Sequence, residues 1–120
     1  MKRYTWLVLT NAEADREEEF ERWYNEVHVP DLLRVPGVVG VTRGKLAKTQ
    51  TSPGPSGIAV VPTEQTRLKY SYLATYIIET DDLPSVLQTV ADWAGTDKMV
   101  MSDALSADIT TMCFEDLMSA

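Results

Sequence analysis

The chain has 120 residues, a net charge of −7 and 44% apolar residues, the size and composition of one soluble globular domain. The acidic balance argues against nucleic acid and anionic membrane surfaces as partners, and no apolar run is long enough to span a bilayer. A single cysteine, Cys113, allows no internal disulfide, so we expect a cytoplasmic protein.

The first half of the chain predicts a strand followed by a helix that breaks. Aromatic and branched residues favour a strand over Tyr4–Thr10. A helix follows over Ala14–His28, where the apolar residues between Phe20 and Val27 recur at helical spacing. Pro30 removes a backbone donor, so the regular helix should end or kink there.

The second half predicts three strands and one helix. These are strands over Val38–Lys45, Tyr70–Glu79 and Ala107–Phe114, and a helix over Leu83–Trp93 with Asp81-Asp82 as its cap. In the first of these strands, Val39, Val41 and Arg43 should share one face.

A long connection, residues 46–69, separates the second and third strands. Gln50–Gly57 is rich in Thr, Ser, Pro and Gly and should hold no regular structure, whereas Ile58–Pro62 is apolar. An exposed apolar run is a liability. We therefore expect this long loop to dock onto a pocket or a partner subunit, with plain disorder as the alternative.

The order of the elements predicts the fold. Strand, helix, strand, strand, helix, strand is the α+β, ferredoxin-like βαββαβ arrangement, a four-stranded antiparallel sheet with two helices on one face. We expect residues 1–120 to form this single domain. Because the strands are apolar on both sides, the uncovered face needs a partner, and a homodimer packed sheet to sheet is the simplest one.

Two stretches carry a family resemblance. Phe20–Asp31, with its Trp-Tyr-x-x-x-His-x-Pro core, and Val35–Val39 resemble the dimeric α/β-barrel superfamily, in particular its EthD-like members; Ser102–Leu105 matches more loosely. The resemblance implies a barrel of two facing sheets and a mostly apolar pocket between each sheet and its two helices, in this superfamily usually without metal or organic cofactor. Activities across the superfamily include lactone isomerisation, polyketide cyclisation, cofactor-independent oxygenation and haem breakdown. Many EthD-like proteins have no assigned reaction.

The candidate catalytic residues gather near the predicted helix break. His28 is the chain's only histidine and the side chain best suited to move protons near neutrality. Tyr24, one turn earlier, could bond the same substrate oxygen, and Asp31 could fix the tautomer of the imidazole. Each also has an ordinary structural explanation: a half-buried histidine at the helix end, a core aromatic and a helix cap.

The candidate substrate-binding residues lie on the strands: Trp6, Arg43, Tyr72 and Tyr76. Aromatic side chains with polar tips are typical walls of sites for aromatic ligands, although they also fill cores and dimer interfaces. Arg43 is a cation at an inward strand position, where it could hold a carboxylate or an enolate; a surface salt bridge is the alternative.

These observations predict a small enzyme that uses no cofactor. One histidine and one cysteine provide no set of metal ligands, and no phosphate-binding motif is present. We expect His28 to act as a general acid/base in isomerisation, cyclisation or dehydration, a lyase or isomerase reaction, of a hydrophobic aromatic or polyketide-like metabolite. The alternatives are a cofactor-independent monooxygenase of the same superfamily and a dimeric protein that binds a small molecule without turnover.

Overall fold

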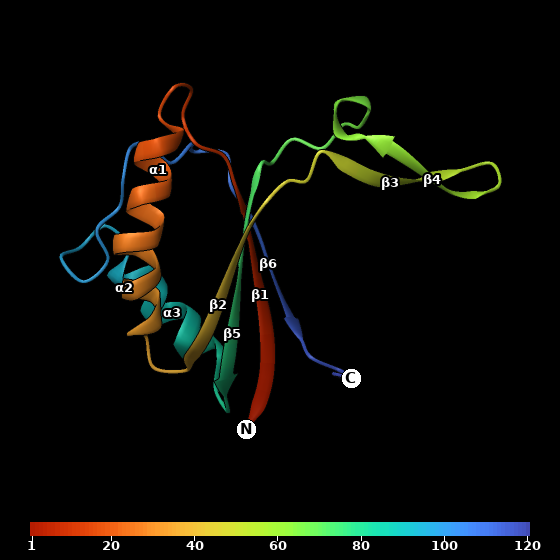
Figure 1. Ribbon diagram of the computed structural model, residues 1–120. Coiled ribbons are helices and arrows are strands. Elements are labelled where there is room, and N and C mark those ends of the chain that lie inside the picture. The colour runs from red at the N-terminus through yellow and green to blue at the C-terminus, as the bar shows by residue number, and fades with distance from the viewer.

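The computed structural model describes residues 1–120 as a four-stranded sheet, two helical segments and a separate hairpin (Figure 1). The sheet holds β1 (Lys2–Thr10), β2 (Val38–Lys45), β5 (Tyr72–Thr80) and β6 (Thr110–Glu115). The hairpin holds β3 (Thr49–Gly54) and β4 (Gly57–Pro62), and the 3-10 turn η2 (Thr63–Gln65) follows it. One helical segment joins α1 (Glu17–Trp23), the π-helical turn η1 (Tyr24–His28) and α2 (Val29–Leu33), and the other is α3 (Leu83–Trp93).

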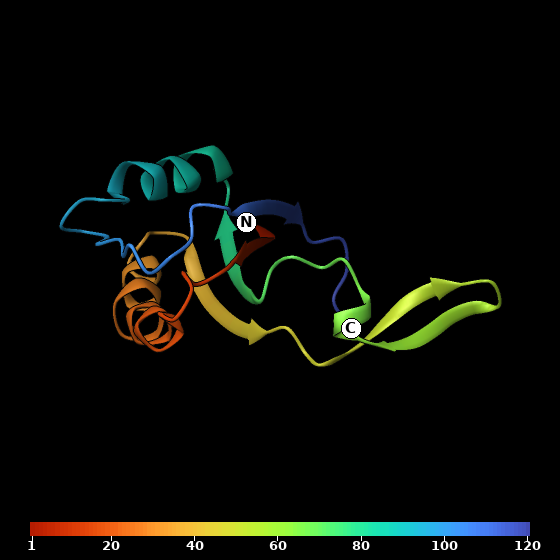
Figure 2. The ribbon, with the colours of Figure 1, turned by 90° about the horizontal axis from the view of Figure 1, so that it is seen from above.

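The sheet confirms the predicted α+β topology. Its strand order is β2-β5-β1-β6 and every pairing is antiparallel, the order of a ferredoxin-like βαββαβ unit. Both helical segments lie on one side of the sheet (Figure 2). The sequence pattern therefore predicts correctly how the four-stranded sheet and the two helical segments are arranged. Together these elements are called here the body of the protein.

The core lies between the sheet and the helices. Alternate residues of β5, Tyr72, Ala74, Tyr76 and Ile78, are buried there, because side chains of a strand point alternately to its two faces. Phe20 of α1 is fully buried against them, with its ring 4.8 Å from the ring of Tyr72.

The helix boundaries correct two predictions. The first helix begins at Glu17 instead of Ala14, and Asp15 has a positive φ of 64° that a helix does not tolerate. The helix also continues past Pro30 to Leu33. Regular α-helical geometry is nevertheless interrupted, as predicted, but by the π-helical turn that comes just before the proline.

A β-bulge corrects the predicted face of Val39. The pairing of β2 with β5 passes from Val38 opposite Ile78 to Gly40 opposite Ile77, which leaves Val39 unpaired. Val38 is therefore buried and Val39 is exposed, whereas Val41 packs against the core and Arg43 is on the same inner face. One extra residue in a strand shifts the inward and outward alternation of its side chains by one position beyond the bulge.

The segment 46–69 is a β-hairpin where the sequence predicts a long loop, so the prediction that Gln50–Gly57 holds no regular structure is wrong. β3 and β4 pair along their whole length, from Thr49 opposite Pro62 to Gly54 opposite Gly57. Pro55 and Ser56 form the connection, and Gly57 has a φ of 118°. Proline in the second and glycine in the fourth position of such a turn are typical of type I turns.

Candidate active site

The π-helical turn between α1 and α2 places three rings side by side. The backbone N–H of Val29 donates to the carbonyl of Tyr24, five residues back, and this wider turn precedes Pro30, which has no N–H to donate. On a regular α-helix, residues five apart would point about 140° away from each other. In the π-helical turn they lie above one another, and the rings of Trp23 and His28 stack with centroids 4.6 Å apart.

The imidazole of His28 is fixed by this aromatic cluster. The ring of Tyr24 meets it edge-on at 5.0 Å. The indole Nε1 of Trp23 donates to the carbonyl of Val100 at 2.9 Å, which ties the helix to the irregular segment before β6. The position of His28 therefore depends on both the helix and that segment.

His28 lines an apolar cavity with a volume of about 130 Å³ between the sheet and the helices. Trp6, Tyr24 and Tyr76 are on the same wall, so the structure brings together four of the seven predicted site residues. The other lining residues come from β1, α2, α3 and the segment before β6: Val8, Thr10, Leu32, Val90, Ala94, Met99, Met101, Leu105 and Ile109.

The polar groups of the cavity are held neutral. Burial lowers the pKa of His28 from 6.5 to about 4; the nearby Asp31 opposes this shift and the charge of Arg43 adds to it. Burial likewise raises the pKa of Tyr24 and that of Tyr76. At neutral pH the cavity thus presents an uncharged imidazole and protonated phenols.

Two polar features of the cavity matter for chemistry. The Nδ1 atom of His28 is buried without a hydrogen-bond partner, which is unfavourable for a polar atom. The hydroxyl oxygens of Tyr24 and Tyr76 lie 3.3 Å apart and share a hydrogen bond. Because only one of the two phenols can donate in that bond, the proton of the other stays available to a bound molecule.

Asp31 does not have the geometry that its predicted role requires. The residue is 7% exposed, and its carboxylate accepts a hydrogen bond from the guanidinium of Arg34, three residues later, just past the end of α2. No hydrogen bond joins it to His28, whose Nδ1 is unpaired. Asp31 therefore acts on the imidazole through its charge and not by fixing its tautomer.

Arg43 and Tyr72 lie outside the cavity, so their predicted contact with substrate is not supported. The guanidinium of Arg43 covers the far side of Tyr24, 4.1 Å from the ring centroid, and donates to Glu21 at 2.7 Å and to Asn25 at 2.8 Å. Both residues line a separate shallow recess with Glu21. The positive charge of Arg43 thus stabilises the ring of Tyr24 through a cation–π contact.

Sequence reasoning missed the residues that close the cavity on the side of β6. Met99, Met101 and Leu105 come from the segment 94–106, whose sequence has no helical or strand period, and Ile109 lies just before the first residue of β6, inside the predicted strand. Their apolar character in an otherwise irregular stretch is the only signal that could have indicated a lining role.

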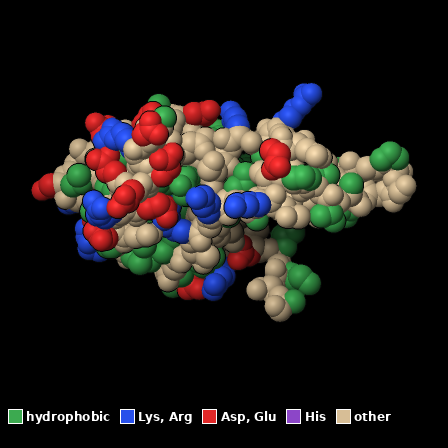
Figure 3. All heavy atoms as spheres, turned by 45° about the horizontal axis from the view of Figure 1, so that its top comes forward, with side chains coloured by type: hydrophobic (Ala, Val, Ile, Leu, Met, Phe, Trp, Pro, Cys, Tyr) green, Lys and Arg blue, Asp and Glu red, His purple; other side chains and the backbone are tan.

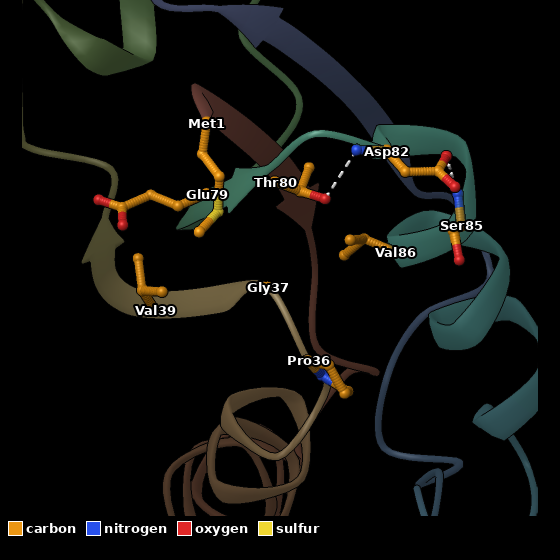
Figure 4. Close-up of a pocket in the computed structure, with 9 residues that line it drawn as sticks. All are labelled: Met1, Pro36, Gly37, Val39, Glu79, Thr80, Asp82, Ser85 and Val86. Carbon is orange, nitrogen blue, oxygen red and sulfur yellow. Dashed lines mark hydrogen bonds between the residues drawn. The ribbon is translucent and has the colours of Figure 1, made fainter.

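A larger cleft lies where β5 meets α3 (Figure 4), with a volume of about 440 Å³. Three of its four polar side chains are bonded within the fold. Thr80 Oγ1 accepts from the N–H of Asp82, Asp82 accepts from the N–H of Ser85 at 3.2 Å, and Glu79 accepts from Arg3 at 2.9 Å. No buried titratable group lines this cleft, and we do not consider it a candidate site.

Two further features are absent from the structure. No group of three His, Cys, Asp or Glu side chains is placed so that it could hold a metal ion. None of the helices combines the length and apolar character needed to cross a membrane.

Comparisons with known proteins give one structural likeness. No family model matches the sequence, and no curated protein does. The crystal structure of an EthD family protein from Bacillus halodurans is similar over 98% of this chain and 100% of its own, at 15% sequence identity and a TM-score of 0.47. That protein belongs to the family that the sequence resembles. At this identity and TM-score the likeness does not extend to activity, substrate or partners.

Proposed function

We propose that the protein is a small enzyme that needs no cofactor and uses His28 as a general base and acid on a hydrophobic ring compound. The observation that carries the proposal is the neutral imidazole of His28, which makes no hydrogen bond within the protein and lines an apolar cavity. A neutral imidazole with no partner in the free protein can accept a hydrogen bond, or a proton, from a bound molecule through the ring nitrogen that reaches the cavity.

The volume of the cavity supports a small substrate. Apolar cavities of about 150 Å³ hold one benzene ring, and the cavity of His28 has about 130 Å³. A single aromatic or alicyclic ring fits this space better than a fused polyketide. The eleven apolar residues among the thirteen that line it favour a ligand with few polar groups.

The groups around the cavity have complementary roles in proton transfer. His28 would take a proton from a carbon next to a carbonyl group, and the free hydroxyl proton of the Tyr24–Tyr76 pair would bond the oxygen on which charge develops. His28 would then return the proton to a different carbon, which completes an isomerisation, or to a leaving hydroxyl group, which completes a dehydration. In a cyclisation the enolate carbon would instead attack a second carbonyl group of the same molecule, and His28 would give the proton to the oxygen of that group.

The proposal is tested with cyclohex-3-enone, a one-ring ketone whose conversion to the conjugated cyclohex-2-enone is seen as a gain in ultraviolet absorbance. We expect turnover by the natural protein and a loss of 100- to 10,000-fold for His28→Gln, the usual range for a positioned acid/base. An unchanged rate in that variant would remove His28 from the mechanism. Saturable binding of phenol without turnover of the ketone would favour the ligand-binding alternative.

We further propose that the protein is a homodimer in which two sheets meet through the face that bears no helices, called here the outer face. Its central residues are apolar or uncharged: Thr5, Leu7, Leu9, Thr42, Leu73, Thr75, Ile77, Met112 and Phe114. The chain exposes 7955 Å², whereas a monomer of 13.4 kDa exposes roughly 6,500 Å². The excess exceeds the roughly 800 Å² that one subunit contributes to a standard interface.

Sedimentation equilibrium tests the dimer. Leu7→Glu places a charge at the centre of the outer face and should give a monomer, whereas the control Val100→Glu, on the helix side, should leave the mass unchanged. A natural protein that is monomeric at all concentrations would contradict the proposal.

A further inference from the structure

The hairpin of β3 and β4, residues 49–62, extends away from the body of the protein and is called here the arm. It leaves the sheet between β2 and β5 and projects on the side opposite to the helices (Figures 1 and 2). Its base is closed by a hydrogen bond from the N–H of Thr63 to the carbonyl of Lys48. Because of the arm the radius of gyration is 16.2 Å, against roughly 13.6 Å for a compact chain of this length.

The surface of the arm is unlike that of the body. Residues 49–62 include no charged side chain, and Figure 3 shows charged side chains over the body but none toward the tip of the arm. Ile58 and Val60 are 80% and 74% exposed. Pro53 and Thr51, which lie opposite them in β3, share the same face of the hairpin. An isolated two-stranded hairpin is at best marginally stable in water, so a partner surface is needed.

The position of the arm identifies that partner. The arm and the outer face lie on the same side of the molecule and meet at an angle (Figure 2). A second copy that covers the outer face therefore also lies beside the arm. The excess exposed surface, nearly twice one subunit's share of a standard interface, is large enough for both contacts.

Charge complementarity favours the same partner. The segment 46–69 has three basic residues, Lys48, Arg67 and Lys69, against one acidic residue, Glu64, a net charge of +2. The rest of the chain therefore has a net charge of −9, which together with the +2 of this segment makes up the total of −7. The base of the arm is attracted to the body of another copy, while the two bodies repel each other.

We propose that the arm packs on a second copy of this chain, so that in a two-fold dimer each subunit extends its arm across the other. The contact uses Ile58 and Val60 and lies outside the sheet-to-sheet contact. This inference rests on the homodimer proposed above and adds an exchange of arms to it.

The test compares the dissociation constants of the dimer by sedimentation equilibrium. Ile58→Ser together with Val60→Ser removes the apolar face of the arm at two exposed positions, so the fold of the subunit is preserved. We expect the dissociation constant to rise at least tenfold. The matched control, Leu33→Ser with Val100→Ser, removes two exposed apolar side chains on the helix side and should leave it unchanged.

A second measurement tests the contact directly. A benzophenone amino acid at position 58, in a 1:1 mixture of isotope-labelled and unlabelled protein, should give cross-links between a labelled and an unlabelled chain. Cross-links only within one chain, or a dissociation constant that the arm variant leaves unchanged, would overturn the arm contact while the dimer stands. A natural protein that is monomeric throughout would overturn both the dimer and the arm contact.

Discussion

Two hollows of the molecule differ in the groups that line them. The cleft between β5 and α3 is larger, about 440 Å³, yet its side chains Thr80, Asp82 and Glu79 are bonded within the fold. The cavity of His28 holds about 130 Å³ and is lined by an imidazole whose Nδ1 atom has no hydrogen-bond partner. In this protein a neutral imidazole without a partner among apolar side chains, and not volume, distinguishes the candidate site from a structural cleft.

The largest expected effect concerns stability in acid. Burial lowers the pKa of His28 from 6.5 to about 4, so between these pH values the unfolded chain binds a proton that the folded chain does not. The free energy of unfolding should therefore fall as the pH falls through this window, by about 3 kcal/mol in total at ~1.4 kcal/mol per unit. Urea unfolding at pH 7, 5.5 and 4 measures the change.

His28→Gln is the control for this prediction. Carboxylates also titrate in this range, so the contribution of the histidine is the difference between the slopes of the two proteins. The variant should lose less stability on acidification. Parallel curves for the two proteins would show that His28 is not held neutral in the fold.

The second prediction concerns a backbone position beside the larger cleft. Gly37 has a φ of 102°, and a Cβ atom there would lie 2.8 Å from Cγ2 of Val86, which faces it in Figure 4. We expect Gly37→Ala to destabilise the protein by about 1–3 kcal/mol without changing the turnover of the folded molecules. Thermal and urea unfolding measure the loss.

Gly44→Ala is the matched control, because a Cβ at Gly44 has no neighbour within 4 Å. Alanine is the better residue in a strand, so this variant should be as stable as the natural protein or slightly more so. Equal stability of the two alanine variants would contradict the role given to Gly37.

The third prediction removes a polar contact of the larger cleft. Asp82 caps α3 by accepting from the N–H of Ser85, and Asp82→Ala should cost about 1 kcal/mol. Asp81→Ala, which loses only an exposed ion pair with the terminal amine of Met1, should have a smaller effect. Neither should alter the turnover of cyclohex-3-enone; a lower turnover would mean that the cleft takes part in function.

The smallest effect is expected from Arg43. Its charge helps to lower the pKa of His28, so Arg43→Met should raise the pKa of His28 toward its ordinary value. Because the chain has one histidine, a single imidazole proton signal followed by NMR reports the titration. Lys45→Met is the control and should leave the pKa of His28 where it was; a shift of equal size in both variants would mean that Arg43 has no specific role.

The body of the protein could be predicted because its signals are local. The alternation in β5 and the helical spacing around Phe20 identify the buried faces. His28, Tyr24, Tyr76 and Trp6 could be selected by their chemistry, and the structure brings them to one cavity. Asp31, Arg43 and Tyr72 could not be separated from them, because sequence does not reveal which charges are paired.

The hairpin shows that turn chemistry outweighs a composition rich in Thr, Ser, Pro and Gly in this segment. Gly54-Pro55-Ser56-Gly57 is a turn signal in the sequence, and the branched residues after it are typical of a strand. The bulge at Val39 has no local signal, and only the apolar character of Met99 and Met101 indicates that they line the cavity. Both features depend on the pairing of β2 with β5 and on the packing of a segment distant in sequence.

The π-helical turn has a consequence for how the protein responds to changes in chain length. It contains one residue more than an α-helical turn would need between Trp23 and Val29. Deletion of the exposed Asn25 should therefore restore an unbroken α-helix in which Trp23 and His28 are four residues apart and still share a face, as do Phe20 and Leu32. A single deletion at this point would thus show whether the site needs the wider turn itself or only the face on which its rings lie.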